Sequence, residues 1–362
     1  MDNLIIDFEN LLTPILGDCP VGADLRIDNT PTSLYYQIKD ARNLARLQER
    51  RLRQGETTDN NVLAIWQKVR SLGKEILATK SKDLEVCVWL IESLLREYQF
   101  AGLKDGFMLA RQLCERYWET LYPLPDEEGF LSRLAPLGGL NGDETNGTLI
   151  DPLFNVPLSS SNKYGSFAFW QYQQAKTIDQ IADPDKRARR SAETNVDLST
   201  VESAVADTSV DFLKNLVENL KSCLVEYQTL ISFLDQKCGN DAPPSSRINE
   251  ALKSALEIIQ YLSRNILVEE SIEVSDDTSK DGKGSLYRHD IQGREEALQS
   301  LGRIADFFLT TEPHSPLSYL IRKVVRWGRL PLPTLLHELI VDERVRDQAF
   351  ILTGIEEEQN QN

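Results

Sequence analysis

Histidine is scarce in this sequence, which argues against a metal site. Only His289, His314 and His337 occur among 362 residues, and none has a Cys or His neighbour at the spacing that zinc ligands require. His337 begins a His-Glu pair, but the residues after it do not complete the HExxH pattern of a zinc-binding helix. We therefore expect no metal and no other cofactor.

Long apolar runs are also lacking, which argues against membrane insertion. The most apolar stretch, residues 86–95, is interrupted by Glu92 and Ser93. It falls short of the roughly 20 apolar residues that a membrane-spanning helix needs. The first four residues lack the basic and apolar regions of a secretory signal. We expect a cytoplasmic protein with no direct membrane insertion.

Basic residues are fewer than acidic ones, 40 against 56, giving a net charge of -16. Such a chain repels nucleic acid and anionic membranes, so we expect protein partners and no nucleic acid. Two basic clusters, at 46–53 and 186–190, lack the interleaved aromatic residues of a nucleic-acid site. Each is either a solvated helix face or a docking site for an acidic protein surface.

Five cysteines form an odd, scattered set, and Cys87, Cys114 and Cys223 fall on apolar helical positions. This pattern is typical of reduced core thiols. Adjacent carboxylates such as Glu295-Glu296 point in different directions on a helix and do not make a general acid and base. We expect no catalytic residue and no enzyme activity. An enzyme with an unrecognised carboxylate site stays an alternative, which a deep polar pocket with converging titratable groups would support.

Helical periodicity dominates what the sequence does contain. Apolar residues at 84–95, with Ser81 available as N-cap, and at 103–121 predict a helical hairpin that ends before Pro123. A longer helix at 212–234 starts with a capping-box pattern from Thr208 to Asp211 and ends at Gly239. A further helix begins near Ser246 and completes a second hairpin. No strand alternation is sustained, so we predict an all-α fold.

Composition divides this predicted fold into several parts. Residues 123–164 are rich in proline, Gly-Gly and Asn-Gly, which predicts a long surface segment. Residues 269–285 lose apolar content and predict an acidic flexible linker. We therefore predict a multi-domain helical protein. Its parts are an N-terminal helical domain (1–165), a middle helical region (166–268), the linker (269–285) and a small C-terminal helical domain (286–362).

Several short motifs occur in the order found in one family. The run from Pro20 to Arg26 is followed by Lys82-Asp83, Trp89-Leu90, Tyr117-Trp118 and Arg133. This order resembles the N-terminal domain of the TssA (ImpA-type) proteins of the bacterial type VI secretion system. One departure is Gln99, where the family pattern has glycine. We interpret these motif residues as structural: Pro20, Gly22, Asp24, Leu25, Arg26, Lys82, Asp83, Tyr117 and Trp118.

The C-terminal sequence from Glu312 to Trp327 resembles the tail of a shorter TssA subgroup. The resemblance implies a component that contacts the baseplate and helps to prime or organise assembly of the sheath and inner tube. It also implies a ring-like homo-oligomer formed through the C-terminal domain. The candidate interface residues, each of which could instead fill the domain's own core, are Pro316, Tyr319, Leu320, Arg322 and Trp327. A generic helical adaptor with unrelated partners is the alternative.

Overall fold

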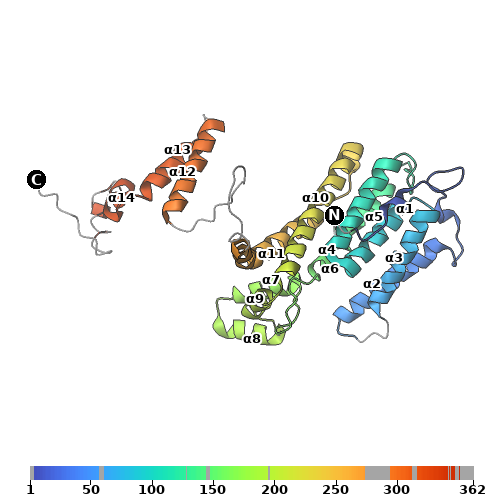
Figure 1. Ribbon diagram of the computed structural model, residues 1–362, viewed down its shortest axis with the longest axis horizontal. Helices are drawn as coiled ribbons and strands as arrows, with labels where there is room; N and C mark the ends of the chain where they lie inside the picture. The colour runs from blue at the N-terminus through green and yellow to red at the C-terminus, as the bar shows by residue number, and fades with distance from the viewer. Residues whose placement is uncertain are drawn as a thin grey trace, which may run out of the picture. The chain divides into compact units, whose positions relative to one another are not determined.

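The computed structural model describes residues 4–56, 61–127, 129–143, 147–194, 196–273, 294–311, 316–340, 342, 344–346 and 350. In this part of the chain the secondary structure is helical, with isolated bridges and no β-strand, which confirms the predicted all-α fold. The chain divides into two compact units (Figure 1), the N-terminal unit (1–278) and the C-terminal unit (279–362).

The first half of the N-terminal unit is built around helix α4. Helices α2 and α3 pack on each other, and α3 packs on α4. Leu77 and Leu90 are fully buried between them, in the continuous apolar core of this unit. The helices are α1 (Phe8–Leu12), η1 (Leu25–Ile27), α2 (Leu34–Arg53), α3 (Val62–Thr79), α4 (Leu84–Tyr117), α5 (Leu131–Asn141) and α6 (Ile150–Phe154).

Helix α4 reverses direction at Gln99, where φ is 56° and ψ is -141°. A Cβ on Gly102 would lie 2.3 Å from the carbonyl oxygen of Leu94, and one on Gly106 would lie 2.9 Å from Ile91. The order of these contacts shows that the arms before and after Gln99 run antiparallel in close contact. The structure thus contains the predicted hairpin, with glycines where the arms approach most closely.

The start of α4 differs from the sequence prediction. Ser81 is not its N-cap, because the carboxylate of Asp83 accepts hydrogen bonds from the backbone N–H groups of Glu85 (2.9 Å) and Val86 (3.1 Å). A carboxylate there satisfies free amides and opposes the positive end of the helix dipole. Ser81 instead pairs with Gly22 in an isolated bridge.

The second half of the N-terminal unit contains two long paired helices, α10 and α11, with shorter helices gathered beside one end of the pair (Figure 1). Ser209, rather than the predicted capping box from Thr208, caps α10 by accepting from the N–H of Phe212. Gly239 ends α10 with a φ of 54°, as predicted. The helices are α7 (Phe169–Asp179), α8 (Pro184–Thr194), α9 (Leu198–Ala206), α10 (Val210–Cys238), η2 (Gly239–Asp241) and α11 (Ser246–Glu273).

The segment 123–164, predicted as a long surface segment, contains two helices. Helix α5 includes Pro136 and two glycines, which weaken its helical signal. Its apolar face is nevertheless buried, with Leu134 and Leu140 each 2% exposed. Tertiary packing therefore outweighs local propensity, and this part of the predicted surface segment forms a packed helix.

One apolar core extends across the predicted boundary at residue 165. The ring centroids of Phe107 and Tyr227 lie 4.8 Å apart, and those of Trp118 and Phe233 lie 5.7 Å apart. These contacts place α10 on the second arm of α4. Independent folding of residues 1–165 stays a prediction. Helix α11 continues to Glu273, so residues 269–273 of the predicted linker are helical, and residues 274–285 lie outside the described residues.

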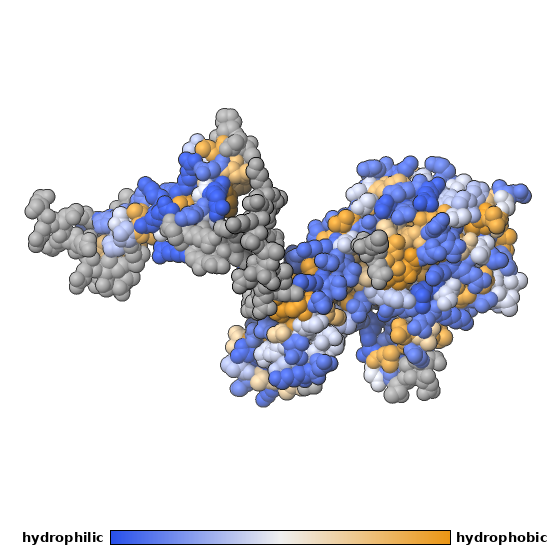
Figure 2. Space-filling view, viewed as in Figure 1, coloured by the Kyte–Doolittle hydropathy of each residue, from blue (hydrophilic) through white to orange (hydrophobic). Residues whose placement is uncertain are grey.

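The C-terminal unit contains α12 (Arg294–Thr311), α13 (Leu317–Trp327) and α14 (Leu332–Leu339). Helices α12 and α13 pack on each other. Gly328 ends α13, and a Cβ at this position would lie 2.5 Å from the side chain of Leu298 on α12. Figure 2 shows apolar side chains at the surface of this unit among polar ones.

Candidate functional site

The motif from Pro20 to Arg26 forms a tight turn at the open end of the α4 hairpin. Pro20 is exposed, and its carbonyl accepts a hydrogen bond from Ile15 N (2.9 Å). Gly22 has a φ of +77°, and a Cβ there would lie 2.0 Å from the carbonyl oxygen of Lys80, so only glycine fits. Leu25 packs against the core in the short helix η1.

Arg26 connects this turn to the start of α4. Its guanidinium pairs with Asp83 (2.7 Å), Glu85 (2.6 Å) and Asp24 (3.2 Å). The Tyr35 hydroxyl donates to Glu85 (2.9 Å). Burial disfavours the charged guanidinium, but Asp83 and Glu85 outweigh this effect and raise the pKa of Arg26. Burial also raises the pKa of the Asp83 carboxyl, with Arg26 acting against that shift.

Lys82 joins three segments from inside the protein. Its side chain is fully buried, and its ammonium donates to the carbonyls of Leu11 (2.8 Å) and Leu77 (2.6 Å). Its backbone N–H donates to Val21 (2.8 Å), and its carbonyl accepts from Tyr122 N (3.0 Å). Burial lowers the pKa of Lys82 to about 8.

Tyr117 and Trp118 fix the other end of the hairpin. The Tyr117 hydroxyl donates to the Leu12 carbonyl (2.7 Å). Trp118 packs against Phe130, with ring centroids 5.2 Å apart, and buried Arg133 donates to the Trp118 carbonyl (2.5 Å). The nine motif residues therefore position the loops at one end of the α4 hairpin.

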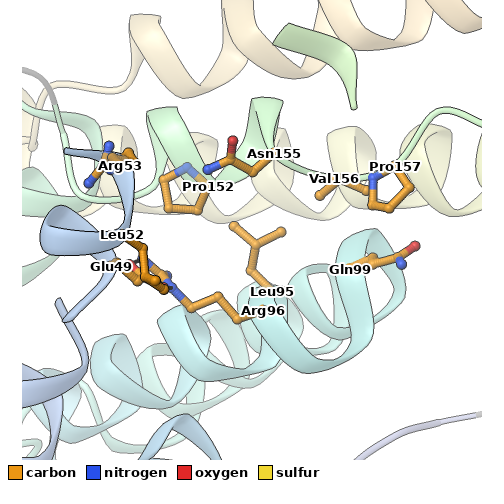
Figure 3. A pocket seen from close by; sticks show the side chains of 10 residues that line it. All are labelled: Glu49, Leu52, Arg53, Leu95, Arg96, Gln99, Pro152, Asn155, Val156 and Pro157. Carbon is orange, nitrogen blue, oxygen red and sulfur yellow. Dashed lines mark hydrogen bonds and ion pairs between the residues drawn. The ribbon is translucent and has the colours of Figure 1, made fainter. Parts of the chain in front are cut away.

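A separate groove, which the sequence motifs did not predict, lies at the opposite, closed end of the hairpin (Figure 3). It occupies about 380 Å³ between the end of α2, the α4 turn and the segment after α6. The strained Gln99 lies on its wall. Its unexpected presence in place of glycine was the one sequence signal at this site. The lining residues are Glu49, Leu52, Arg53, Leu95, Arg96, Gln99, Pro152, Asn155, Val156 and Pro157.

The C-terminal candidates fall into two groups. Tyr319 and Leu320 are 63% and 58% exposed. By contrast, Arg322 pairs with Asp306 of α12 (2.7 Å). Exposure at a large apolar side chain is the property that an interface needs, so the first group fits this role better.

The remaining C-terminal candidates contact their own unit. Trp327 Nε1 donates to Glu338 of α14 (2.6 Å), and the Lys323 ammonium lies 4.8 Å from its ring centroid. Pro316 precedes α13, and its carbonyl accepts from Leu320 N (3.0 Å). These contacts indicate that Trp327 and Pro316 stabilise α13 within its own unit.

Metal-ligating side chains do not cluster in the described residues, where no group of three His, Cys, Asp or Glu could hold an ion. His337 is exposed, while His289 and His314 lie outside those residues. Within the same ranges, no helix is long and apolar enough to cross a membrane.

Comparisons with known proteins agree on one family. The family described as ImpA, N-terminal, type VI secretion system matches residues 12–142. The type VI secretion system component TssA1 of Pseudomonas aeruginosa is 22% identical over 363 residues, which covers 93% of this chain and 96% of the relative. Residues 12–142 match the ImpA N-terminal family, and the chain as a whole is similar to TssA components of the type VI secretion system. This confirms the resemblance found in the motifs.

A solved TssA structure has a fold similar to that of this chain. It is the N-terminal domain, including the conserved ImpA_N region, of the TssA component of the type VI secretion system from Burkholderia cenocepacia. The match has a TM-score of 0.60 and 26% identity, and it covers 73% of this chain and 96% of the solved chain. The TssA family is thus supported by sequence motifs, by whole-length similarity and by fold.

Proposed function

We propose that this chain is a cytoplasmic assembly factor of a type VI secretion system, which contacts the baseplate and helps to prime or organise polymerisation of the sheath and inner tube. The observation that carries the proposal is the similarity to TssA1 over 93% of the chain. The motif residues support it, because they hold together the domain that defines the family. The chain acts by binding proteins and performs no catalysis.

Sheath assembly in cells tests this role. Cells that lack the protein but carry a fluorescent sheath subunit should form few or no extended sheaths, and the full chain should restore them. Normal sheath number and length in the deletion strain would contradict the proposal. Retained sheath assembly would leave only the alternative of an adaptor with unrelated partners.

Self-association through the C-terminal unit is the second part of the proposal. Leu317, Leu320 and Val324 recur at intervals of three and four residues, which places them on one stripe of α13. They are 44%, 58% and 47% exposed. A monomeric surface rarely leaves such a stripe in water, whereas a symmetric oligomer buries it. Tyr319 lies off this stripe.

Removal of residues 286–362 should leave a folded species of lower mass in light scattering. Leu320→Asp should dissociate the oligomer, because a charge in an apolar interface is strongly unfavourable. Gln299→Asp is a matched control at an exposed position of α12. If the truncated protein keeps the mass of the full assembly, self-association lies in residues 1–285.

A further inference from the structure

The groove beside Gln99 has an apolar floor and an elongated form. Leu95 and Val156 are 2% and 4% exposed and form its base, while the more exposed Leu52 stands at one side. Figure 3 shows Arg53 towards one end of the groove and Gln99 with Pro157 towards the other. Its volume of about 380 Å³ falls within the range of about 300–1,000 Å³ that ligand pockets occupy.

The charges around the groove are already paired. Arg96 donates to both carboxylate oxygens of Glu49, at 2.7 and 3.0 Å, and its guanidinium stacks on Trp66 at 4.1 Å from the ring centroid. Arg53 pairs with Asp151. Since each guanidinium has a carboxylate partner, the groove offers little net attraction to an anionic or cationic ligand. Its chemistry favours a neutral ligand.

Two primary amides are the remaining polar groups. The side chains of Gln99 and Asn155 make no hydrogen bond to another described residue. A primary amide both donates and accepts, so it matches the N–H and C=O of a peptide backbone. Apolar walls with a few convergent polar groups are the usual composition of a specific binding site.

The backbone at Gln99 adds an independent observation. A φ of 56° with a ψ of -141° is unfavourable for any side chain, and glycine would form this turn without strain. Strained non-glycine residues cluster at binding sites, where the side chain has a role that a glycine could not fill. Here the strained position places an amide on the groove wall.

The geometry points to a peptide-binding site in this groove. Its ligand is an extended, uncharged segment of a partner protein. An apolar side chain of the segment enters between Leu52, Leu95 and Val156, and the backbone beside it exchanges hydrogen bonds with the amides of Gln99 and Asn155. This assignment concerns a surface distinct from the motif residues and from α13, and it holds whether or not the chain acts in sheath assembly.

A random peptide library displayed on phage is a suitable probe for the full-length protein. Selection should enrich peptides that contain an apolar residue and have no acidic or basic residue next to it. Binding of a synthetic consensus peptide is then measured by fluorescence polarisation for four proteins: the full chain, Gln99→Gly, Asn155→Ala and the control Gln180→Gly. Gln180 is an exposed residue at the end of α7 and is not among the residues that line the groove.

Gln99→Gly should weaken binding about two- to tenfold, the effect of one lost hydrogen bond, and Asn155→Ala should act similarly. Gln180→Gly should bind like the unchanged chain. Gln99→Gly removes backbone strain, so circular dichroism should show it fully folded, and weaker binding would report the lost amide.

Four outcomes would overturn the proposal. In the first, no displayed peptide is enriched more than phage that display no peptide. In the second, the enriched peptide binds Gln99→Gly as tightly as it binds the unchanged chain. Enrichment of peptides that need acidic residues would instead indicate recognition by Arg53. A fall in oligomer mass of Gln99→Gly, without peptide, would show that a second copy of the chain occupies the groove.

Discussion

Arg26 and Asp83 are separated by 57 positions in the sequence, yet a 2.7 Å ion pair joins them. Asp83 is fully buried and also caps α4, while Arg26 extends from the motif turn. One carboxylate thus ties the N-terminal segment to the start of the hairpin. Its loss removes both connections.

Asp83→Ala should lower the free energy of unfolding by about 3 kcal/mol, because it removes a helix cap and leaves Arg26 without its most buried partner. Urea unfolding followed by circular dichroism measures the change. Glu193→Ala, which breaks an exposed ion pair with Arg190, is the control and should cost less than about 1 kcal/mol. Equal effects of the two substitutions would show that burial of the pair contributes little.

Gln99→Gly should raise the free energy of unfolding by about 1 kcal/mol, since a strained φ and ψ cost about 1–3 kcal/mol and the greater freedom of glycine in the unfolded chain offsets part of that gain. Gln99→Ala keeps the strain and should not stabilise. Thermal unfolding of both variants tests this prediction. A destabilised Gln99→Gly would mean that the glutamine side chain stabilises the turn by more than the strain costs.

Gly102→Ala should destabilise the protein by about 2 kcal/mol or more, because its Cβ would lie 2.3 Å from the Leu94 carbonyl and force the arms of α4 apart. Gly139→Ala is the matched control. Outside its chain neighbours and the backbone of its own helix, no atom of the described residues lies within 4 Å of a Cβ at Gly139, and alanine favours the helix. In urea unfolding, Gly102→Ala should lower the free energy of unfolding and Gly139→Ala should raise it. A stable Gly102→Ala protein would show that the hairpin tolerates separation.

Lys82 predicts a pH dependence with a defined sign. The pKa of Lys82 is about 8 in the folded protein and 10.5 ordinarily, so between these values the unfolded chain binds more protons and stability rises with pH. Relative to Lys82→Met, the unchanged protein should gain on the order of 3 kcal/mol across this window. Urea unfolding at pH 7, 8.5 and 10 measures the difference, in which effects of other groups cancel. If the stabilities of the unchanged protein and Lys82→Met changed with pH in parallel, the prediction for Lys82 would be wrong.

Residues 1–165 should form a soluble fragment that unfolds cooperatively, although less stable than residues 1–273. The shorter fragment lacks α10, which covers Phe107 and Trp118. Calorimetry of both fragments tests this expectation. Aggregation of the shorter fragment, under conditions where the full chain is soluble, would place the folding boundary beyond residue 165.

The long helices were predictable from sequence because their apolar spacing is regular, as at Leu213, Leu216 and Leu220 of α10. Helix α5 was not, since Pro136 and two glycines hide a face that is buried only by tertiary packing. The contact of α10 with α4 was also beyond local patterns, because Phe107 and Tyr227 are far apart in the chain. Periodicity shows that a face is apolar and does not show which element covers it.

The candidate sites also differ in whether local sequence patterns could predict them. The motif order led to Arg26, Lys82 and Asp83, which the structure brings together at one end of the hairpin. The groove could not be predicted, because its walls come from three separate segments. Only the side chain at Gln99, in place of an expected glycine, gave a local signal for it.

The placement of α10 on α4 also affects synthesis of the protein on the ribosome. The α4 hairpin is complete at Tyr117, but the helix that covers its second arm ends only at Cys238. Ribosomes add roughly 5–20 residues per second, so the nascent chain presents an uncovered apolar surface for on the order of 10 s. Translation rate and chaperone supply should therefore control the yield of folded protein more strongly than the stability of the finished fold does.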